Sequence, residues 1–478
     1  MTLSPTSLAA EFEPATRAGW LALVEKTLKG AGVETLNSRG PDGVTIAPLY
    51  DRSLELAGFA PAPRVGERPW DIRTRVRHPQ RALAHDALLE GLAGGAASAI
   101  LALRQAGADG VAIASAEDMD AVLEGVLIDI APVALDAGFL GPLAAQWLSE
   151  AAKGSPAAPL GFHLDPLSAF AVSGESPGPI DSHVISAAGT AARLAAIHPK
   201  ASLFLASGGV VHEAGGGPAL ELAFATASAL AYLKAMIRAG LPIAAAADGI
   251  VIGVAVDSDP LISIAKLRAA RMLWARMASA CGAGVQARIE ARSSRRMLTR
   301  ADPWTNMVRL TVACLGGAVG GADAVVLGAF TDALGLPTAF ARRMARNTQL
   351  ILMEEGHLGA VADPVAGAGA FEALSRDLAR AAWAKFNAIE AAGGAVAALR
   401  DGVIVREVLA ARDELSAAIA AGEQRIVGVT DFQAAETRLA AVEDVPATGA
   451  SPSPDTRLPG PNSHCPALTQ VSLEDLAR

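Results

Sequence analysis

Cysteine is scarce in this sequence, and its spacing matters as much as its number. The 478 residues contain only Cys281, Cys314 and Cys465, and no two of them form a Cys-x-x-Cys pair. Three scattered cysteines supply neither a disulfide framework nor a thiolate zinc site. Such sparse usage favours a reducing compartment, and we therefore expect a cytoplasmic protein.

Signals for export, for a membrane and for nucleic acid are also missing. The first residues hold no basic stretch followed by an apolar run, as a secretory signal would. The apolar stretch 243–256 is interrupted by Asp248 and is too short to span a bilayer. The 40 Lys and Arg against 49 Asp and Glu leave a net charge of −9, which disfavours non-specific binding to nucleic acid. We expect no membrane or nucleic-acid partner.

Motifs for phosphate and zinc chemistry are absent as well. No GxxxxGK sequence is followed by Ser or Thr, so the chain has no P-loop of that type. His212-Glu213 lacks the second histidine of HExxH. His163 and His357 stand alone, and a structural role is the better interpretation for each. No metal site is predicted.

The sequence does contain a regular alternation of short apolar runs and helical patterns. Hydrophobic residues make up 51% of the chain, which is enough for a large core. Apolar runs that alternate with helices predict a parallel sheet covered on both faces, and eight such units favour a closed (β/α)8 barrel of the TIM type. The eight predicted strands are residues 98–103, 110–114, 132–136, 160–164, 202–206, 249–256, 285–291 and 324–329.

We predict the barrel within residues 81–336 and different structures on either side of it. Residues 1–80 form an N-terminal arm, whose helix places Trp20, Leu21 and Val24 at helical spacing. Such an arm cannot bury its apolar face alone, so it must lie on the barrel or on a partner. Residues 337–440 form a C-terminal helical extension. Residues 441–478 are rich in Pro, Ser and Thr and are predicted to be a disordered tail.

One basic cluster falls on a predicted helix. Lys266, Arg268 and Arg271 lie within two turns of each other near its start. Taken alone, this pattern is typical of a solvated helical face.

Several long segments resemble one family. They are Ile264-Ala-Lys-Leu-Arg-Ala-Ala-Arg-Met-Leu-Trp274, Leu298-Thr-Arg-Ala-Asp-Pro-Trp-Thr-Asn-Met-Val-Arg309 and Arg342-Arg-Met-Ala-Arg-Asn-Thr-Gln-Leu-Ile-Leu-Met-Glu-Glu355. These segments resemble the methylmalonyl-CoA mutases, and the resemblance runs from about residue 10 to 405. It implies a barrel that holds a CoA ester along its axis. It also implies a separate flavodoxin-like domain that carries adenosylcobalamin, the source of the radical that drives a 1,2-carbon shift.

The chain departs from that family after the predicted fifth strand. Catalytic members carry Ser-Gly-Tyr-His-x-x-Glu-Ala-Gly, whereas this chain reads Ser207-Gly-Gly-Val-Val-His-Glu-Ala-Gly215. Gly209 and Val210 therefore stand where the resemblance expects tyrosine and histidine. His212 lies two residues later and is an alternative candidate for the histidine's role.

A second departure follows the predicted seventh strand. Catalytic members carry His-Cys-Gln-Thr-Ser-Gly, and Glu290-Ala-Arg-Ser-Ser-Arg295 occupies that place here. Glu290 and Arg292 thus put charge where neutral side chains would contact the substrate. Asp181-Ser-His183 shares the start of a cobalamin-ligating motif but lacks its following glycine. The Asp165-Pro-Leu element is similar to one in the family's small subunits.

These departures predict a non-catalytic small subunit with no cobalamin-binding domain, no catalytic residue and no cofactor of its own. It would pair as a heterodimer with a catalytic alpha subunit of methylmalonyl-CoA mutase, which would hold adenosylcobalamin, and would itself bind CoA esters weakly at most. The alternative hypothesis is a divergent acyl-CoA mutase chain that uses a cobalamin domain on a separate polypeptide. Glu290, Arg292 or His212 would then act in a new constellation.

Overall fold

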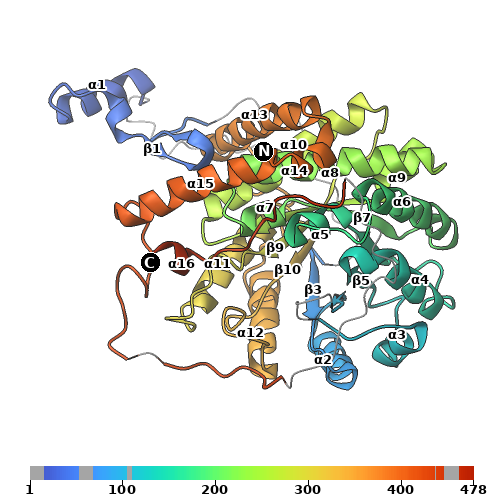
Figure 1. The fold of residues 1–478 in the computed structure, drawn as a ribbon. Helices are drawn as coiled ribbons and strands as arrows, with labels where there is room; N and C mark the ends of the chain where they lie inside the picture. Colours follow the sequence, from blue (N-terminus) through green and yellow to red (C-terminus); the bar gives the residue numbers. More distant parts are fainter. Residues whose placement is uncertain (1–14, 53–67, 105–109, 437, 446–461) are drawn as a thin grey trace, which may run out of the picture.

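A closed barrel of eight parallel strands forms the centre of the protein (Figure 1). The computed structural model describes residues 15–52, 68–104, 110–436, 438–445 and 462–478. Each barrel strand pairs with the next along the chain, and β10 closes the barrel on β3. The strands are β3 (Asp71–Val76), β4 (Ser98–Ala102), β5 (Val133–Asp136), β6 (Gly161–Leu164), β7 (Ser202–Ser207), β8 (Ile250–Val256), β9 (Arg288–Ser293) and β10 (Ala324–Val326). The predicted (β/α)8 fold is confirmed.

Helices connect the strands and continue beyond the last one. Those of the barrel are α2 (Arg81–Ala93), α3 (Ala116–Leu123), η3 (Gly138–Leu140), α4 (Gly141–Ala151), α5 (Pro166–Ser173), α6 (Ile180–Ile197), α7 (Gly209–Glu213), α8 (Pro218–Arg238), α9 (Ile243–Asp248), α10 (Pro260–Ala280) and α11 (Asn306–Val319). The later ones are α12 (Ala339–Leu350), η4 (Ile351–Glu355), α13 (Gly369–Ala391), α14 (Gly394–Arg400), α15 (Val403–Ala420) and α16 (Leu473–Leu476).

One predicted strand is wrong, and an unpredicted one replaces it. Residues 110–114 lie outside any strand and make only an isolated bridge between Leu103 and Val111. Val111 is nevertheless fully buried, so its apolar surroundings reflect the core rather than the sheet. The missing barrel strand is β3, which lies inside the region assigned to the arm. The predicted boundary at residue 80 therefore falls after the first barrel strand.

Helix α8, which at 21 residues is as long as α10, has an apolar composition that its position explains. By length and hydropathy α8 could cross a membrane, but 72% of its apolar window is buried inside the protein. The helix packs on β7 and β8 on one side and against α13 on the other. The C-terminal helical extension therefore completes the cover of the barrel, since α13 also packs on α10.

The basic cluster of α10 is buried, so the prediction of a solvated helical face is wrong. Lys266 and Arg268 are each 2% exposed. The Nζ of Lys266 lies 2.7 Å from Oε2 of Glu221, and Nη2 of Arg268 lies 2.7 Å from Oε1 of Glu372. Arg268 also pairs with Asp363. These carboxylates arrive from α8 and the α13 region, so a pattern confined to α10 could not reveal them.

The N-terminal arm touches the barrel through a short hairpin. Strands β1 (Ser38–Arg39) and β2 (Thr45–Ile46) flank η2 (Pro41–Gly43), where Asp42 accepts a 2.7 Å hydrogen bond from the backbone N–H of Ala219 at the start of α8. Helix α1 (Arg17–Thr27) and η1 (Val33–Leu36) lie further out (Figure 1). No residue of α1 is buried. The arm is thus anchored at one end and uncovered at the other.

The last described segment, residues 462–478, packs on the barrel, which corrects the predicted disordered tail over this part. Its backbone N–H groups donate hydrogen bonds to carbonyl oxygens of α5, of α7 and of the loop after β9: Leu468 N to Ala171 O, Val471 N to Glu213 O and Leu473 N to Arg296 O. Leu468 and Glu474 are buried. We call residues 462–478 the strap. Residues 446–461 of the predicted tail lie outside the described residues.

Candidate functional site

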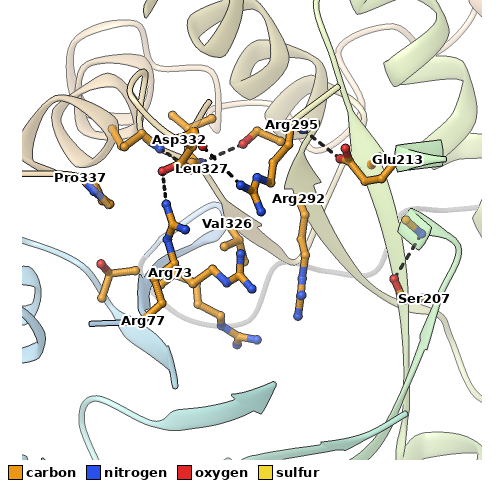
Figure 2. Close-up of a pocket in the computed structure, with 18 of the residues that line it drawn as sticks. Arg73, Arg77, Ser207, Glu213, Arg292, Arg295, Val326, Leu327, Asp332 and Pro337 are labelled. Atoms are coloured by element: carbon orange, nitrogen blue, oxygen red, sulfur yellow. Dashed lines mark hydrogen bonds and ion pairs between the residues drawn. The ribbon is translucent and has the colours of Figure 1, made fainter. Parts of the chain in front are cut away.

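A cavity of about 280 Å³ opens at the carboxyl ends of the barrel strands. In parallel barrels this end collects the loops that carry function. Its lining combines arginines of β3 and β9 with apolar residues such as Val254 and Val326 (Figure 2). It is the candidate functional site.

Strand β3 and the residue that follows it, Arg77, supply three of the cavity's arginines. Arg73, Arg75 and Arg77 alternate with Thr74 and Val76, so the period of two places all three on one face of the strand. All three line the cavity, and Figure 2 shows Arg73 and Arg77 beside it. Strand β3 is missing from the predicted strands, although its alternation of arginine with uncharged residues was a usable signal.

Glu290 is the centre of an ion-pair network across the barrel axis. Its Oε2 lies 2.7 Å from Nη1 of Arg73, and its Oε1 lies 2.7 Å from Nε of Arg292. Arg73 also pairs with Asp71 at 2.7 Å. Burial alone would raise the pKa of Glu290, but the neighbouring positive charge, that of Arg292 above all, lowers it to about 2. Glu290 is therefore a fixed anion and a poor proton donor.

A second carboxylate continues the network. Oδ2 of Asp136 lies 3.2 Å from Nη1 of Arg292 and 3.1 Å from Nη2 of Arg75. Burial would raise the pKa of Asp136, but Arg292 and Arg75 hold it below its usual value. Charges on β3, β5 and β9 thus neutralise one another across the barrel.

Gly209 and Val210 begin α7, immediately after β7, and both line the cavity. The structure therefore places these two predicted positions in the same site as Arg292. Neither side chain can donate or accept a proton. The hydroxyl of Ser207 lies in this region but accepts a 3.2 Å hydrogen bond from the backbone N–H of Gly209.

His212 does not line the cavity, although it lies on the same short helix. It is 2% exposed, its Nε2 is 2.8 Å from the hydroxyl of Ser294, and its Nδ1 is 3.5 Å from Oε2 of Glu221. Burial, aided by the charge of Arg296, lowers its pKa. His212 therefore belongs to the buried Glu221–Lys266 cluster beside the barrel axis. His183, on the outer helix α6, packs against Phe139.

His163 is a further residue of the barrel interior whose surroundings the sequence did not predict. It is 4% exposed, its φ is 42°, and neither ring nitrogen has a partner among the described residues. Burial lowers its pKa to about 4. The strand register shifts between Gly161 and Leu164, on either side of it.

The strap crosses the mouth of this cavity. Leu468 and Gln470 line it from the strap side, and Gln470 donates a 3.4 Å hydrogen bond to Glu213. Among the described residues no group of three or more His, Cys, Asp or Glu side chains is arranged to hold a metal ion.

The methylmalonyl-CoA mutase family profile matches residues 72–451. The chain belongs to the methylmalonyl-CoA mutase family. It is 40% identical to the methylmalonyl-CoA mutase small subunit of Streptomyces virginiae over 95% of this chain and 76% of that protein. It is 32% identical to the small subunit from Propionibacterium freudenreichii subsp. shermanii, over 94% and 74% of the two chains. Identity to the methylmalonyl-CoA mutase of Cereibacter sphaeroides is 29%, over 96% and 70%.

A corrinoid is the cofactor of methylmalonyl-CoA mutases, and the described residues do not fit one at the barrel mouth. Leu468 and Gln470 of the strap cover the face on which a planar macrocycle would have to lie. His212, on the helix beside this mouth, is buried with both ring nitrogens in contact with protein groups. No step of chemistry is therefore assigned to a corrinoid on this chain's barrel.

Proposed function

We propose that this chain is the non-catalytic small subunit of an adenosylcobalamin-dependent methylmalonyl-CoA mutase. The interconversion of methylmalonyl-CoA and succinyl-CoA would take place on a catalytic alpha subunit. One observation carries the proposal: the ion-paired Glu290 and Arg292 occupy the barrel axis, where the family resemblance expects a neutral histidine and glutamine. Glu290 and Arg292 form an ion pair with each other, so neither side chain is available to act on a thioester.

Adenosylcobalamin would be bound by the catalytic subunit in this arrangement. Two features support that assignment: the strap covers the barrel mouth, and Gly209 and Val210 provide no polar group beside it. CoA esters would bind to this chain weakly at most, because the arginine–carboxylate network crosses the axis along which an acyl group would enter.

Helix α1 supports the heterodimer. Leu23 is 66% exposed, and Trp20, Leu21 and Val24 are only partly buried in the isolated chain. A helix that leaves such apolar side chains exposed or only half-buried needs cover from another molecule. We expect that cover to come from the catalytic subunit.

A cytoplasmic location fits the thiol chemistry of the chain. Cys281, Cys314 and Cys465 are all free. Burial raises the pKa of the Cys314 thiol to about 12, so this group does not react as a thiolate. Cell fractionation with an antibody to the chain tests the location, and recovery in a membrane or secreted fraction would contradict it.

The alternative of a divergent, independently catalytic acyl-CoA mutase is not favoured. It requires Glu290, Arg292 or His212 to meet a substrate. Glu290 and Arg292 neutralise each other, and His212 does not line the cavity. A re-specialised enzyme would need at least one of them in contact with the ligand and able to exchange a proton.

The deciding experiment is mutase turnover with methylmalonyl-CoA and adenosylcobalamin in three preparations: this chain alone, the catalytic chain alone, and both co-expressed. We expect this chain to be inactive and free of bound cobalamin by absorbance, yet to co-purify with an active partner in a 1:1 molar ratio, as a heterodimer requires. Turnover by this chain with only a free-standing cobalamin-binding protein would refute the proposal.

A further inference from the structure

One guanidinium group at the barrel mouth has no carboxylate partner among the described residues. Arg295 follows closely on β9, which ends at Ser293, and it lines the cavity. Its Nη2 donates only a 3.3 Å hydrogen bond, to the backbone carbonyl oxygen of Asp332. The side chain is partly buried, so water compensates its charge only in part.

Two carboxylates lie at the same mouth, but other donors occupy them. Oδ1 of Asp332 lies 2.6 Å from Nη2 of Arg77, and its Oδ2 accepts a 3.0 Å hydrogen bond from a backbone N–H. Glu213 accepts hydrogen bonds from the backbone N–H groups of Arg295 and Arg296, at 2.9 and 3.0 Å. Both carboxylates therefore hold the loops together and leave the Arg295 guanidinium without an ion pair.

The backbone of Arg295 is fixed, so its guanidinium is held in place. The N–H group donates to Glu213, and the carbonyl oxygen accepts a 3.0 Å hydrogen bond from the N–H of Leu298. Figure 2 shows the side chain extending from this loop into the space between Asp332 and Arg292. A cation that is positioned in advance loses little conformational entropy when it binds an anion.

A second arginine, Arg75, lies close enough to be repelled by this charge. It lines the cavity with a side chain that is 35% exposed, and among the described residues its Nη2 alone is bonded, to Asp136. Burial lowers the pKa of Arg75, and the charges of three neighbouring arginines, Arg295 among them, lower it further against the effect of Asp136. An anion between Arg75 and Arg295 would relieve this repulsion.

The walls of the mouth strengthen any charge interaction inside it. Val254, Val326 and, from the strap, Leu468 line its sides with apolar surface. Attraction between opposite charges grows as the surroundings become less polar. Because Leu468 and Gln470 also cover the opening, an occupant must be compact.

We propose that the barrel mouth binds a compact oxyanion, with Arg295 as its principal counter-charge and Arg75 as a second donor of hydrogen bonds. The shared chemistry is a charged group with at least two oxygens, which a guanidinium binds with paired hydrogen bonds. A small carboxylate and inorganic phosphate both satisfy it. Arg295 stands where the family resemblance expects glycine, so this counter-charge is not inherited from the substrate site of the catalytic members. The site lies wholly within one chain and is independent of the proposed subunit role.

The test uses titration calorimetry on the purified full-length chain, without partner or turnover, at constant ionic strength set with sodium chloride. The probes are inorganic phosphate and acetate, with acetamide as the neutral control. The variants are Arg295→Gln, which removes the charge, and Arg295→Lys, which keeps the charge but removes the paired hydrogen bonds. Arg343→Gln is the matched control, because Arg343 is exposed beside the Phe340 ring and does not line the cavity.

We expect saturable 1:1 binding of at least one oxyanion, about tenfold weaker or worse in Arg295→Gln, about threefold weaker in Arg295→Lys and unchanged in Arg343→Gln. Binding of phosphate alone or of acetate alone supports the site and identifies the group that it takes. No saturable heat at on the order of 10 mM of either oxyanion overturns the proposal. So does equal binding by wild type and Arg295→Gln. If Arg295→Gln does not fold, Arg295→Lys decides, and wild-type affinity in that variant overturns the proposal.

Discussion

Glu290→Gln provides a direct test of the barrel-axis network. The substitution keeps the shape of the side chain but removes the charge that faces Arg73 and Arg292, both within 2.7 Å. The Glu290 side chain is 1% exposed, and breaking a buried pair of this kind costs about 3–5 kcal/mol. A shift of the Glu290 pKa from 4.5 to about 2 corresponds independently to about 3 kcal/mol of folding free energy.

The two magnitudes agree, and the pKa shift also fixes the dependence on pH. Because the folded pKa of Glu290 is depressed, its contribution to stability is complete above pH 4.5 and is lost as the pH falls towards 2. Chemical denaturation at pH 7 should therefore show Glu290→Gln less stable by about 3 kcal/mol. The difference from wild type should shrink steadily in denaturation curves recorded at lower pH.

Two further variants make the outcome decisive. Glu150→Gln removes an exposed carboxylate that pairs with Lys153 on the surface of α4, and its unfolding midpoint should not change. Adding Arg292→Met to Glu290→Gln should recover part of the loss, because it removes one of the two guanidinium groups that share the Glu290 carboxylate. A Glu290→Gln protein as stable as wild type at pH 7 would refute the network as a structural element.

Other regions give equally concrete expectations. Arg268→Met should destabilise the protein by about 3–5 kcal/mol, because it removes the guanidinium group that forms an ion pair with the buried Glu372. Hydrogen exchange should rise first in α13, and uniform exchange across the chain would contradict this. Leu23→Asp, on the uncovered α1, should leave the melting temperature unchanged yet weaken co-purification with the proposed catalytic subunit, and unaltered co-purification would remove the arm from the proposed interface. Leu468→Asp should increase hydrogen exchange in the strap, whereas the exposed-site variant Leu439→Asp should not.

The sequence predicted most of the barrel because most of its strands are buried on both faces. Strands β4 and β8, for example, read as unbroken apolar runs and are fully buried in the structure. Strand β3 fails that criterion, because its inward face carries Arg73 and Arg75 and its apolar residues alternate with them. A strand that lines a charged barrel axis resembles a surface segment when its neighbours are unknown.

Residues of the site could be predicted only where a single sequence segment was enough to identify them. Comparison of single segments placed Gly209, Val210, Glu290 and Arg292 at the barrel mouth, and all but Glu290 line the cavity there. Their partners were beyond such reasoning: Arg73 lies 217 residues from Glu290 in the chain. The buried role of Lys266 was hidden for the same reason, since Glu221 reaches it from another helix.

The position of α8 has a consequence for synthesis of the chain on the ribosome. Its apolar surface is covered by α13, which ends at Ala391, whereas α8 itself ends at Arg238. At about 5–20 residues per second, the intervening 153 residues (391 − 238) take roughly 8–30 s to emerge. For that time a long hydrophobic helix is exposed on an incomplete barrel. Nascent chains stalled before residue 391 should therefore be bound by chaperones, and those released after it should not.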